Sequence, residues 1–329
     1  MKYRYWRPIS IDYITPGYFP DVALYMKVNG NFVMYKPPER KFTEDDRLRL
    51  ERNFMEFLYI RAGDMMEIND YLENNLAEML ERKDISGIVK GRILYQTVVN
   101  YLIDVFERPE LVSCQERYVN LIHLMLLHQY SSTAKERIES LRTVTGLNYY
   151  IFGHSVQVAA LNLLMHENLF DMNLDGLTDV GIGSLFHDMG MALISDGVLD
   201  RPDALCGVEF HKLKQHTQQG YEFMQQLGVF SKSVLDIVRH HHERYDGSGY
   251  PTGAKGAAIP ITAQATILCD VYNALTTDRY RSHRKRNGMT HEDALKLMRE
   301  EARAGAYNTE LFNQFEEIMN VILMQYEHA

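Results

Sequence analysis

The spacing of apolar residues changes near residue 85 and divides the chain into two parts. Up to that point the apolar runs are short and are bounded by turn residues, as in a chain that forms strands. We predict strands at residues 9–14, 22–28, 31–35 and 56–60, and helices at residues 43–53 and 64–82. Asn29-Gly30 between two of these strands fits a hairpin turn, because both residues tolerate positive φ. Residues 1–84 are therefore expected to form a small α/β domain.

From about residue 85 onward, apolar residues recur with the three- and four-residue spacing of helices. The pattern predicts a helix capped by Ser86, a helix with His154 on its apolar face, and helices at residues 109–129, 133–142, 177–187, 209–226, 232–242, 260–276, 290–304 and 308–326. Residues 196–202 and the glycine-rich stretch 246–251 are expected to be loops. We therefore predict a mainly α protein, in which residues 85–144 form a helical linker region and residues 145–329 form an all-helical bundle.

Composition limits the kind of protein further. The 329 residues carry a formal net charge of -9, which argues against binding a nucleic-acid polymer or a membrane surface. No apolar run approaches the roughly 18 residues that span a bilayer, and the first residues lack the apolar core of a signal peptide. Cys114, Cys206 and Cys269 have no metal-type spacing and suit reduced thiols. We therefore expect a cytoplasmic protein.

Histidines and aspartates in separate helical segments supply the candidate chemistry. The donors come from five segments: His154, His187-Asp188, His216, His241-His242 and Asp270. A lone His-Asp pair means little, so the prediction rests on several donors that coincide in one bundle, whose facing helices commonly build metal sites. Imidazole nitrogens and carboxylate oxygens together suit divalent transition metals. We expect His240 to point away from this group.

The charges of this donor set are compatible with two metal ions. Five neutral imidazoles and two carboxylates carry a charge of -2, against +4 from two divalent ions. The surplus can hold a bridging hydroxide and still attract a phosphodiester anion. Two ions about 3.5–4 Å apart lower the pKa of a shared water and hold the attacking and leaving oxygens. The pattern therefore favours hydrolysis of a phosphate ester, with Asp188 as a bridge between two ions, His187 as a ligand of one ion, and His241 and His242 as ligands of the other.

Several segments resemble the HD-GYP family, the branch of the HD-domain phosphohydrolases that cleaves cyclic di-GMP. The matching segments are His187-Asp188-Met189-Gly190, His216 with Gly220, HHERYDGSGYP at residues 241–251, and residues 269–281. The resemblance covers about residues 145–325 and implies an HD domain that uses iron or manganese. It implies as ligands His154, His187, Asp188, His216, His241, His242 and Asp270. It further implies hydrolysis of cyclic di-GMP to pGpG or GMP through a metal-bridging hydroxide, with His187 and Asp188 as catalytic residues.

The resemblance also implies contacts around the metal ions. The Gly249-Tyr250-Pro251 loop would border the substrate cleft and contact partner proteins such as diguanylate cyclases. We predict four substrate-binding residues: Tyr250, Arg279, Arg281 and Lys255, of which Arg279 is the first candidate for a phosphate contact. A homodimer is a further expectation if the apolar helix at residues 109–129 is exposed.

Four positions depart from the family pattern. Met191 stands where the family usually has a lysine that contacts substrate phosphate, and such a charge-assisted contact contributes roughly 1.5–3 kcal/mol. Tyr150 stands where members with three metals carry a glutamate, so we predict two metal ions. Asn273 replaces an aspartate beside the ligands, and Tyr280 replaces the proline of an Arg-Pro-Tyr motif.

These departures leave more than one function open. The first is a metal-dependent cyclic dinucleotide phosphodiesterase. The second is a catalytically weak or inactive cyclic dinucleotide receptor or scaffold that acts through the Gly-Tyr-Pro loop, and the third is a phosphodiesterase for another cyclic dinucleotide such as cyclic GMP-AMP. The N-terminal domain carries no chemical motif, so a structural or oligomerisation module and a regulatory or sensory module both remain open.

Overall fold

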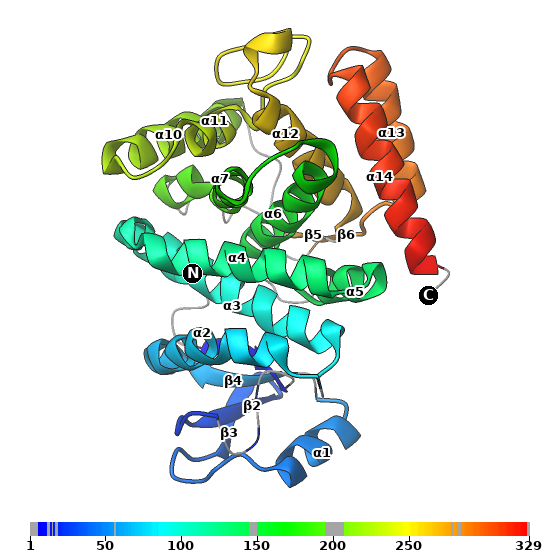
Figure 1. Cartoon of the computed structure of the whole chain (residues 1–329). Coiled ribbons are helices and arrows are strands. Elements are labelled where there is room, and N and C mark those ends of the chain that lie inside the picture. The colour runs from blue at the N-terminus through cyan, green and yellow to red at the C-terminus, as the bar shows by residue number, and fades with distance from the viewer. Residues whose placement is uncertain are drawn as a thin grey trace.

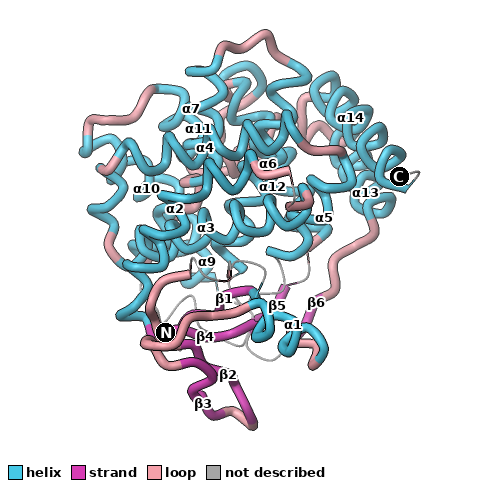
Figure 2. Tube along the Cα trace, turned by 60° about the horizontal axis from the view of Figure 1, so that its bottom comes forward, coloured by secondary structure: helices cyan, strands magenta, loops and turns pink. Residues whose placement is uncertain are grey.

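The computed structural model describes residues 6–11, 14, 16, 19–55, 57–83, 85–144, 150–194, 207–277, 279–281 and 284–327. Figure 1 shows a stack in which a small sheet domain lies at one end and layers of helices follow it. In Figure 2 the N-terminal strands again gather at one end, and helices make up most of the remainder. The expected mainly α fold, with a small α/β part before a helical bundle, is confirmed.

The N-terminal strands form one antiparallel sheet in the order β1-β4-β2-β3. The strands are β1 (Trp6–Ser10), β2 (Leu24–Val28), β3 (Asn31–Lys36) and β4 (Phe57–Arg61). Asn29 and Gly30 form the expected hairpin turn, with φ of 49° and 83°. The predicted first strand is wrong in its bounds, because residues 6–10 pair with β4 while Ile11 and Ile14 are buried beyond the strand.

Helix α2 connects this sheet to the bundle. Helices α1 (Glu44–Arg52) and α2 (Met65–Glu81) follow β3 and β4 in the chain. Thr43 caps α1 through a capping box with Asp46, as its sequence indicates. In Figure 1, α2 lies between the sheet and α3 (Gly87–Glu107). Its buried Leu72 and Leu76 belong to the same apolar core as Leu58 of β4.

Helix α3 lies at the centre of the molecule. It contacts α2, α4 (Gln115–Ser131), α5 (Ala134–Val144) and α6 (Tyr150–Leu169). Its Leu94, Val98 and Leu102 are fully buried in a core that extends from Ile9 to Val238. The apolar core is thus continuous across residues 84 and 144, and domain boundaries at these residues stay predictions.

The helix predicted at residues 109–129 is divided in two. A 3-10 turn, η3 (Pro109–Ser113), precedes α4 because Cys114 leaves the helical conformation, with φ of −78° and ψ of 78°. Most of the apolar side chains of α4 are buried, among them Tyr118 and Met125. We expected a homodimer only if this apolar helix were exposed. Because these side chains are buried, that condition does not hold for them.

The remaining helices include those that carry the predicted site. They are α6, α7 (Leu174–Leu185), α9 (Gly207–Lys214), α10 (His216–Leu227), α11 (Lys232–His240), α12 (Ile261–Thr276), α13 (His291–Arg303) and α14 (Thr309–Glu327). The helix predicted at residues 209–226 is divided at Gln215 into α9 and α10. A hairpin of β5 (Arg279–Arg281) and β6 (Arg284–Arg286) was not predicted. The loop predicted at residues 196–202 lies outside the described residues.

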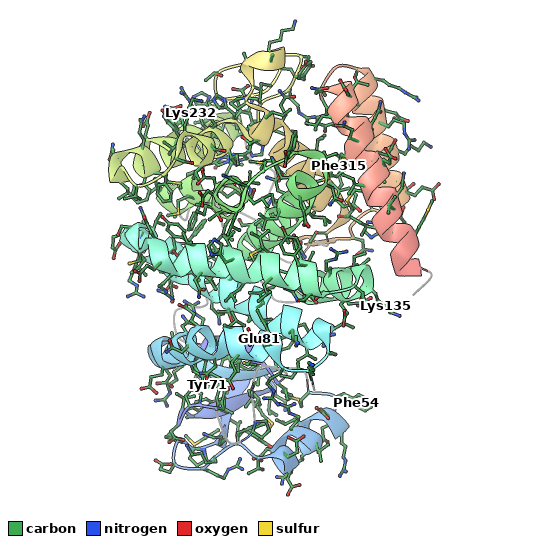
Figure 3. The ribbon with its side chains drawn as sticks, viewed as in Figure 1. Phe54, Tyr71, Glu81, Lys135, Lys232 and Phe315 are labelled. Atoms are coloured by element: carbon green, nitrogen blue, oxygen red, sulfur yellow. The ribbon has the colours of Figure 1, made fainter. Side chains whose placement is uncertain are left out.

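A second apolar core joins the C-terminal helices. Leu268 of α12, Met298 of α13 and Phe315 of α14 are all buried within it. Figure 3 shows Phe315 between these helices, whereas Lys232 and Lys135 lie at the outside of the molecule. This packing fixes α12, which carries Asp270, against the rest of the bundle.

Candidate metal centre

Three histidines of the predicted site lie where helices end. His187 follows α7, His216 follows α9, and His241 caps the C-terminal end of α11. Each ring places Nδ1 close to the backbone carbonyl oxygen three residues earlier: 2.7 Å to Ser184, 2.7 Å to Leu213 and 3.0 Å to Val238. The last carbonyls of a helix have no intrahelical partner, so an imidazole N–H satisfies them. This bond keeps the proton on Nδ1 and leaves the lone pair on Nε2.

The Nε2 atoms of these histidines converge on Asp188. The distance to Asp188 Oδ1 is 3.2 Å from His216 and 3.7 Å from His241, and His187 lies 3.5 Å from Oδ2. The Nε2 atoms of His216 and His241 are also only 3.2 Å apart. Because each Nδ1 already donates, lone pairs face one another and a carboxylate, which requires a proton or a cation between them. A divalent metal ion fits this donor set.

Asp188, His241 and His242 carry the charges that metal binding requires, whereas His187 holds a second proton that a bound metal ion would displace. Burial alone would raise the pKa of Asp188, but His187 and the hydrogen bonds of the surrounding histidines hold it well below its usual value. Burial alone would lower the pKa of His187, whereas the neighbouring Asp188 raises it to about 9. Burial lowers the pKa of both His241 and His242. Asp188 is therefore an anionic donor at neutral pH, and His241 and His242 are neutral donors.

His154 and Asp270 form the other side of the cluster. His154 on α6 places Nε2 2.9 Å from Asp270 Oδ1 on α12. The centre of its ring lies 5.4 Å from that of His187. Burial alone would raise the pKa of Asp270, but the hydrogen bond and charge of His154 lower it. Asp270 is therefore a second anionic donor beside Asp188.

Asn273 and Gln157 orient His154 from behind. The Nδ1 atom of His154 lies 2.7 Å from Asn273 Oδ1. The Asn273 amide nitrogen donates to Gln157 Oε1 at 2.7 Å, and the Gln157 amide nitrogen donates to the Leu141 carbonyl at 2.9 Å. These bonds fix the Asn273 amide so that its oxygen faces His154 Nδ1. The Nε2 atom of His154 therefore faces the cluster. We did not anticipate Gln157, although it lies three residues after His154 on the same helix face.

His242 and Tyr250 lie at the more open side. His242 has an exposed side-chain fraction of 32%, and its Nδ1 lies 3.8 Å from Asp270 Oδ2. The Tyr250 ring lies 4.8 Å from the His242 ring between centroids. Burial raises the pKa of Tyr250, and the charges of Asp188 and Asp270 raise it further. The Gly-Tyr-Pro loop therefore brings a protonated phenol to the border of the cluster.

All seven predicted ligands lie in one connected group. The donor atoms lie within 4.8 Å of one another in two subsets: Asp188, His216, His241 and His242, and His154, His187 and Asp188. Asp188 belongs to both subsets, as a bridging residue must, and Asp270 contacts one histidine of each. His240 instead faces Glu243, with 3.8 Å between Nδ1 and Oε1. That these side chains bind metal stays a prediction.

Two glycines allow the site segments to approach closely. A Cβ atom on Gly190 would lie only 1.9 Å from the carbonyl oxygen of His216. A Cβ atom on Gly220 would lie 2.9 Å from the backbone nitrogen of Gly190. The turn after Asp188 can therefore pack on the start of α10 only because both residues lack side chains. This contact explains the glycine in each of the two motifs.

The loop between α11 and α12 is held from within. Glu243 is fully buried and accepts hydrogen bonds from the backbone nitrogen and the hydroxyl of Thr252, at 2.8 and 2.7 Å. Asp246 accepts a hydrogen bond from the Ser248 backbone nitrogen at 2.9 Å. Both carboxylates thus fix the loop that presents Tyr250.

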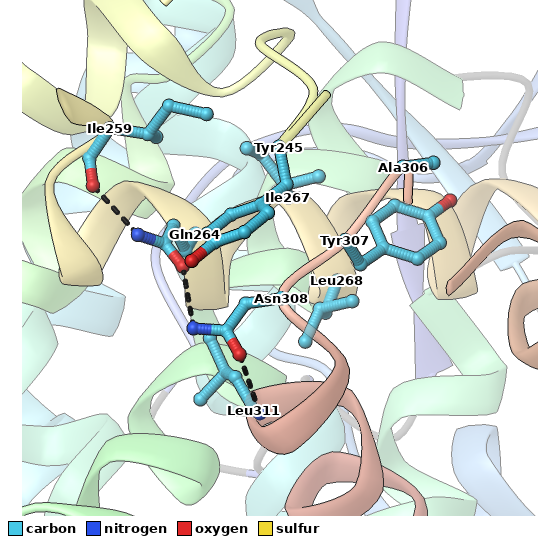
Figure 4. Close-up of a pocket in the computed structure, with 9 residues that line it drawn as sticks. All are labelled: Tyr245, Ile259, Gln264, Ile267, Leu268, Ala306, Tyr307, Asn308 and Leu311. Atoms are coloured by element: carbon cyan, nitrogen blue, oxygen red, sulfur yellow. Dashed lines mark hydrogen bonds between the residues drawn. The ribbon is translucent and has the colours of Figure 1, made fainter. Parts of the chain in front are cut away.

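Figure 4 shows a small pocket at the base of this loop. There Gln264 donates to the Ile259 carbonyl at 2.7 Å and accepts a hydrogen bond from Asn308 at 3.3 Å. Tyr245 lines the same pocket, and its backbone nitrogen donates to the Ala306 carbonyl at 2.9 Å. No predicted ligand lines it, so the pocket belongs to the support of the loop.

The other three predicted substrate-binding residues, Lys255, Arg279 and Arg281, are separated along the chain from the seven candidate ligands. Lys255 is in the loop, where its Cβ atom lies 3.6 Å from the position of a Cβ on Gly247. Arg279 and Arg281 are in β5, whose register pairs them with Arg286 and Arg284. The substrate contacts of Lys255, Arg279 and Arg281 stay predictions.

A bundle whose facing helices supply histidines around a shared aspartate has the arrangement from which helical proteins build buried metal sites. Among known families, a model described as HD domain matches residues 129–311. The chain therefore belongs to the HD-domain family, and its HHERYDGSGYP segment identifies the HD-GYP branch.

Proteins similar to this chain include bacterial phosphodiesterases. The cyclic di-GMP phosphodiesterase PA4108 of Pseudomonas aeruginosa is 35% identical over 130 residues, or 40% of this chain and 31% of its own. The cyclic di-GMP phosphodiesterase response regulator RpfG of Xanthomonas campestris is 32% identical over 52% of this chain and 46% of its own. The 3'3'-cGAMP-specific phosphodiesterase 1 of Vibrio cholerae is 30% identical over 52% of this chain and 38% of its own. The chain thus spans less than half the length of these relatives.

A solved structure has the same fold. Bd1817, a HDG"Y"P protein from Bdellovibrio bacteriovorus, aligns with a TM-score of 0.67 over 96% of this chain and 99% of its own, at 19% sequence identity. Both the N-terminal part and the bundle lie within this alignment. Among the described residues, no helix has the length and apolar character needed to cross a membrane.

Proposed function

We propose that this protein is a metal-dependent phosphodiesterase that hydrolyses a cyclic dinucleotide, with cyclic di-GMP as the first candidate substrate. The observation that carries the proposal is the convergence of five histidines and two aspartates on one buried group with Asp188 at its centre. The names of the relatives support the substrate class, since each of the three is a phosphodiesterase of cyclic di-GMP or 3'3'-cGAMP.

The donor set fits two divalent transition-metal ions. One subset of ligands is His154, His187 and Asp188, and the other is Asp188, His216, His241 and His242. Imidazole nitrogens combined with carboxylates suit iron or manganese. When bound, such ions lower the pKa of a water molecule and polarise a phosphoryl oxygen.

The protein's own residues prepare the site for this chemistry. The backbone carbonyls behind His187, His216 and His241 hold the three rings with Nε2 facing inward. Asp188 stays ionised and is shared by both subsets of ligands. Tyr250, whose phenol keeps its proton, lies beside His242 and can donate a hydrogen bond to a phosphate oxygen. Together these groups suit in-line attack of one water molecule on a phosphodiester, which opens the ring to pGpG, and of a second water on the remaining phosphodiester, which yields two GMP.

A second candidate function is a cyclic dinucleotide receptor or scaffold. Met191 in η4 (Met189–Leu193) offers no charge to a phosphate, and Asn273 offers a neutral amide to His154. Loss of both charges favours binding over turnover. In that case the exposed Ser248 and Thr252 of the loop would face a partner protein such as a diguanylate cyclase in the cytoplasm.

The two functions are separated by metal analysis and product chromatography. Protein purified without oxygen is expected to carry about two equivalents of iron or manganese and to convert cyclic di-GMP, 3'3'-cGAMP or both to linear products. His187→Ala and Asp188→Ala are expected to lower turnover at least about hundredfold, while His123→Ala, at an exposed position of α4, leaves it unchanged. Binding without turnover, with turnover gained in Met191→Lys, would favour the receptor. Metal-loaded protein that neither binds nor hydrolyses either nucleotide would contradict both functions.

A further inference from the structure

A lysine outside the predicted site lies at the border of the ligand cluster. Lys214 is the last residue of α9, and His216 follows two residues later. Its ammonium lies 5.1 Å from the centre of the Tyr250 ring and 4.8 Å from that of Phe210. Its side chain is half-buried between these two aromatic rings. The charge is therefore held in place by ring faces.

Among the described residues, no carboxylate forms an ion pair with Lys214, whereas Lys232 of α11 and Arg244 of the loop that carries Tyr250 are paired. Lys232 contacts Asp236 at 2.5 Å, and Arg244 contacts Glu301 at 2.9 Å. A lysine ammonium has three N–H donors, and the faces of aromatic rings do not occupy all of them as hydrogen-bond acceptors would. Lys214 thus keeps donors for an anion that enters from outside.

The Tyr250 ring joins Lys214 to the ligand cluster. Its centroid lies 4.8 Å from that of the His242 ring and 6.4 Å from that of the His216 ring. His242 is the more exposed member of the cluster, with a side-chain exposure of 32%. A phosphate that approaches His242 along Tyr250 therefore passes close to the Lys214 ammonium.

The position of Lys214 also matches a missing charge. Met191 takes the place of a lysine that the family resemblance expects near the substrate phosphate. The 3-10 turn that carries Met191 packs on the start of α10, where Gly190 meets the carbonyl of His216. Lys214 lies just before the same helix start. We propose that Lys214 binds a phosphate group of the cyclic dinucleotide and supplies the cation that residue 191 lacks.

This inference rests on the proposed function, and the test separates the two. A phosphorothioate analogue of cyclic di-GMP that resists hydrolysis is titrated into metal-loaded wild type, Lys214→Ala, Lys214→Arg and Lys212→Ala. Lys212 is the matched control, because it is exposed on the same helix and belongs to none of the contacts described here. Metal content and thermal unfolding are measured for each protein.

We expect Lys214→Ala to raise Kd about 10- to 100-fold, as for loss of a charge-assisted hydrogen bond. Lys214→Arg is expected to restore most of the affinity, and Lys212→Ala to bind as the wild type does. Added salt is expected to weaken wild-type binding more steeply than binding by Lys214→Ala, a difference that a purely structural role would not produce. If the wild type binds and Lys214→Ala binds equally well with the same salt dependence, the inference is overturned while the proposed function stands. If the wild type binds neither this analogue nor the corresponding analogue of 3'3'-cGAMP, the proposed function is overturned, and the inference with it.

Discussion

At the scale of single residues, the site depends on groups that hold the histidines from behind. The Nδ1 atoms of His187, His216 and His241 donate to helix-end carbonyls, whereas that of His154 donates to the side chain of Asn273. A backbone carbonyl cannot be changed by substitution, but Asn273 can. His154 is therefore the ligand whose orientation is open to a direct test.

Asn273→Ala is expected to weaken metal binding about 10- to 100-fold, because second-sphere partners of a ligating histidine contribute this much. Asn273→Asp is expected to strengthen binding relative to the wild type, since a carboxylate partner makes the imidazole a stronger donor. Competition with a chelator of known affinity measures both effects. Equal metal affinity in all three proteins would show that Asn273 does not orient a ligand.

The seven candidate ligands could be singled out from the sequence, but the groups that hold them in place could not. Histidine and aspartate can be identified as candidate metal ligands from their side-chain chemistry and from the HHERYDGSGYP segment, without knowledge of how the side chains are oriented. The hydrogen bond of His241 to Val238 depends on where α11 ends, and the contact of Gln157 with Asn273 joins two helices distant in sequence. Lys214 could not be singled out, because only the fold brings it to Tyr250.

At the scale of helices, buried histidines link packing to pH. His128 of α4 is 1% exposed, and its Nδ1 lies 3.0 Å from the Ser132 hydroxyl. Its Nε2 packs against Gly91 of α3, where a Cβ atom would lie 2.5 Å away, and it has no hydrogen-bond partner among the described residues. Burial lowers the pKa of His128 to about 4, although the charge of Glu136 opposes this shift.

This pKa predicts a loss of stability in mild acid. The unfolded chain takes up a proton near pH 6.5, whereas folded His128 does so only near pH 4. The contribution of neutral His128 to the free energy of unfolding is therefore complete above pH 6.5. It is lost as the pH falls toward 4, and the loss is about 3 kcal/mol at most. Denaturant unfolding of His128→Gln should show a flatter pH dependence across this window. His123→Gln, at an exposed position of the same helix, serves as the control, and identical pH profiles for the wild type and His128→Gln would contradict the account.

The spacing of apolar residues predicted which segments are helical, but it did not predict where some of the helices end. The break at Gln215 between α9 and α10 has no glycine or proline to mark it. The β5–β6 hairpin lacks the alternation of apolar and polar residues that predicts strands, since its strands are Arg279–Arg281 and Arg284–Arg286. Such elements are set by tertiary contacts rather than by local pattern.

At the scale of the whole molecule, the N-terminal part and the bundle share one apolar core and are joined by hydrogen bonds and an ion pair. Leu58 of the sheet and Leu102 of α3 belong to the same apolar cluster. Asn69 of α2 donates to Asp104 of α3 at 2.7 Å. Arg117 of α4 binds both carboxylate oxygens of Glu73 on α2, at 3.0 and 2.6 Å. The sheet domain thus covers one side of the bundle.

Deletion of residues 1–84 is therefore expected to damage the bundle. It exposes the apolar side of α3 that α2 covers, and exposed patches of this kind cause aggregation. We expect the shortened protein to be insoluble or to unfold at a lower temperature than the full chain. Size-exclusion chromatography and thermal unfolding measure this, and a monomer with an unchanged unfolding temperature would contradict a shared core.

The central claim is that seven side chains from five separate segments bind a pair of metal ions around Asp188. Anomalous X-ray diffraction from crystals of protein purified without oxygen tests this most directly, because it locates metal ions without reference to activity. We predict two peaks, one beside His154, His187 and Asp188 and one beside Asp188, His216, His241 and His242. A metal-replete crystal with no peak beside Asp188, or with peaks only elsewhere on the protein, would contradict the account.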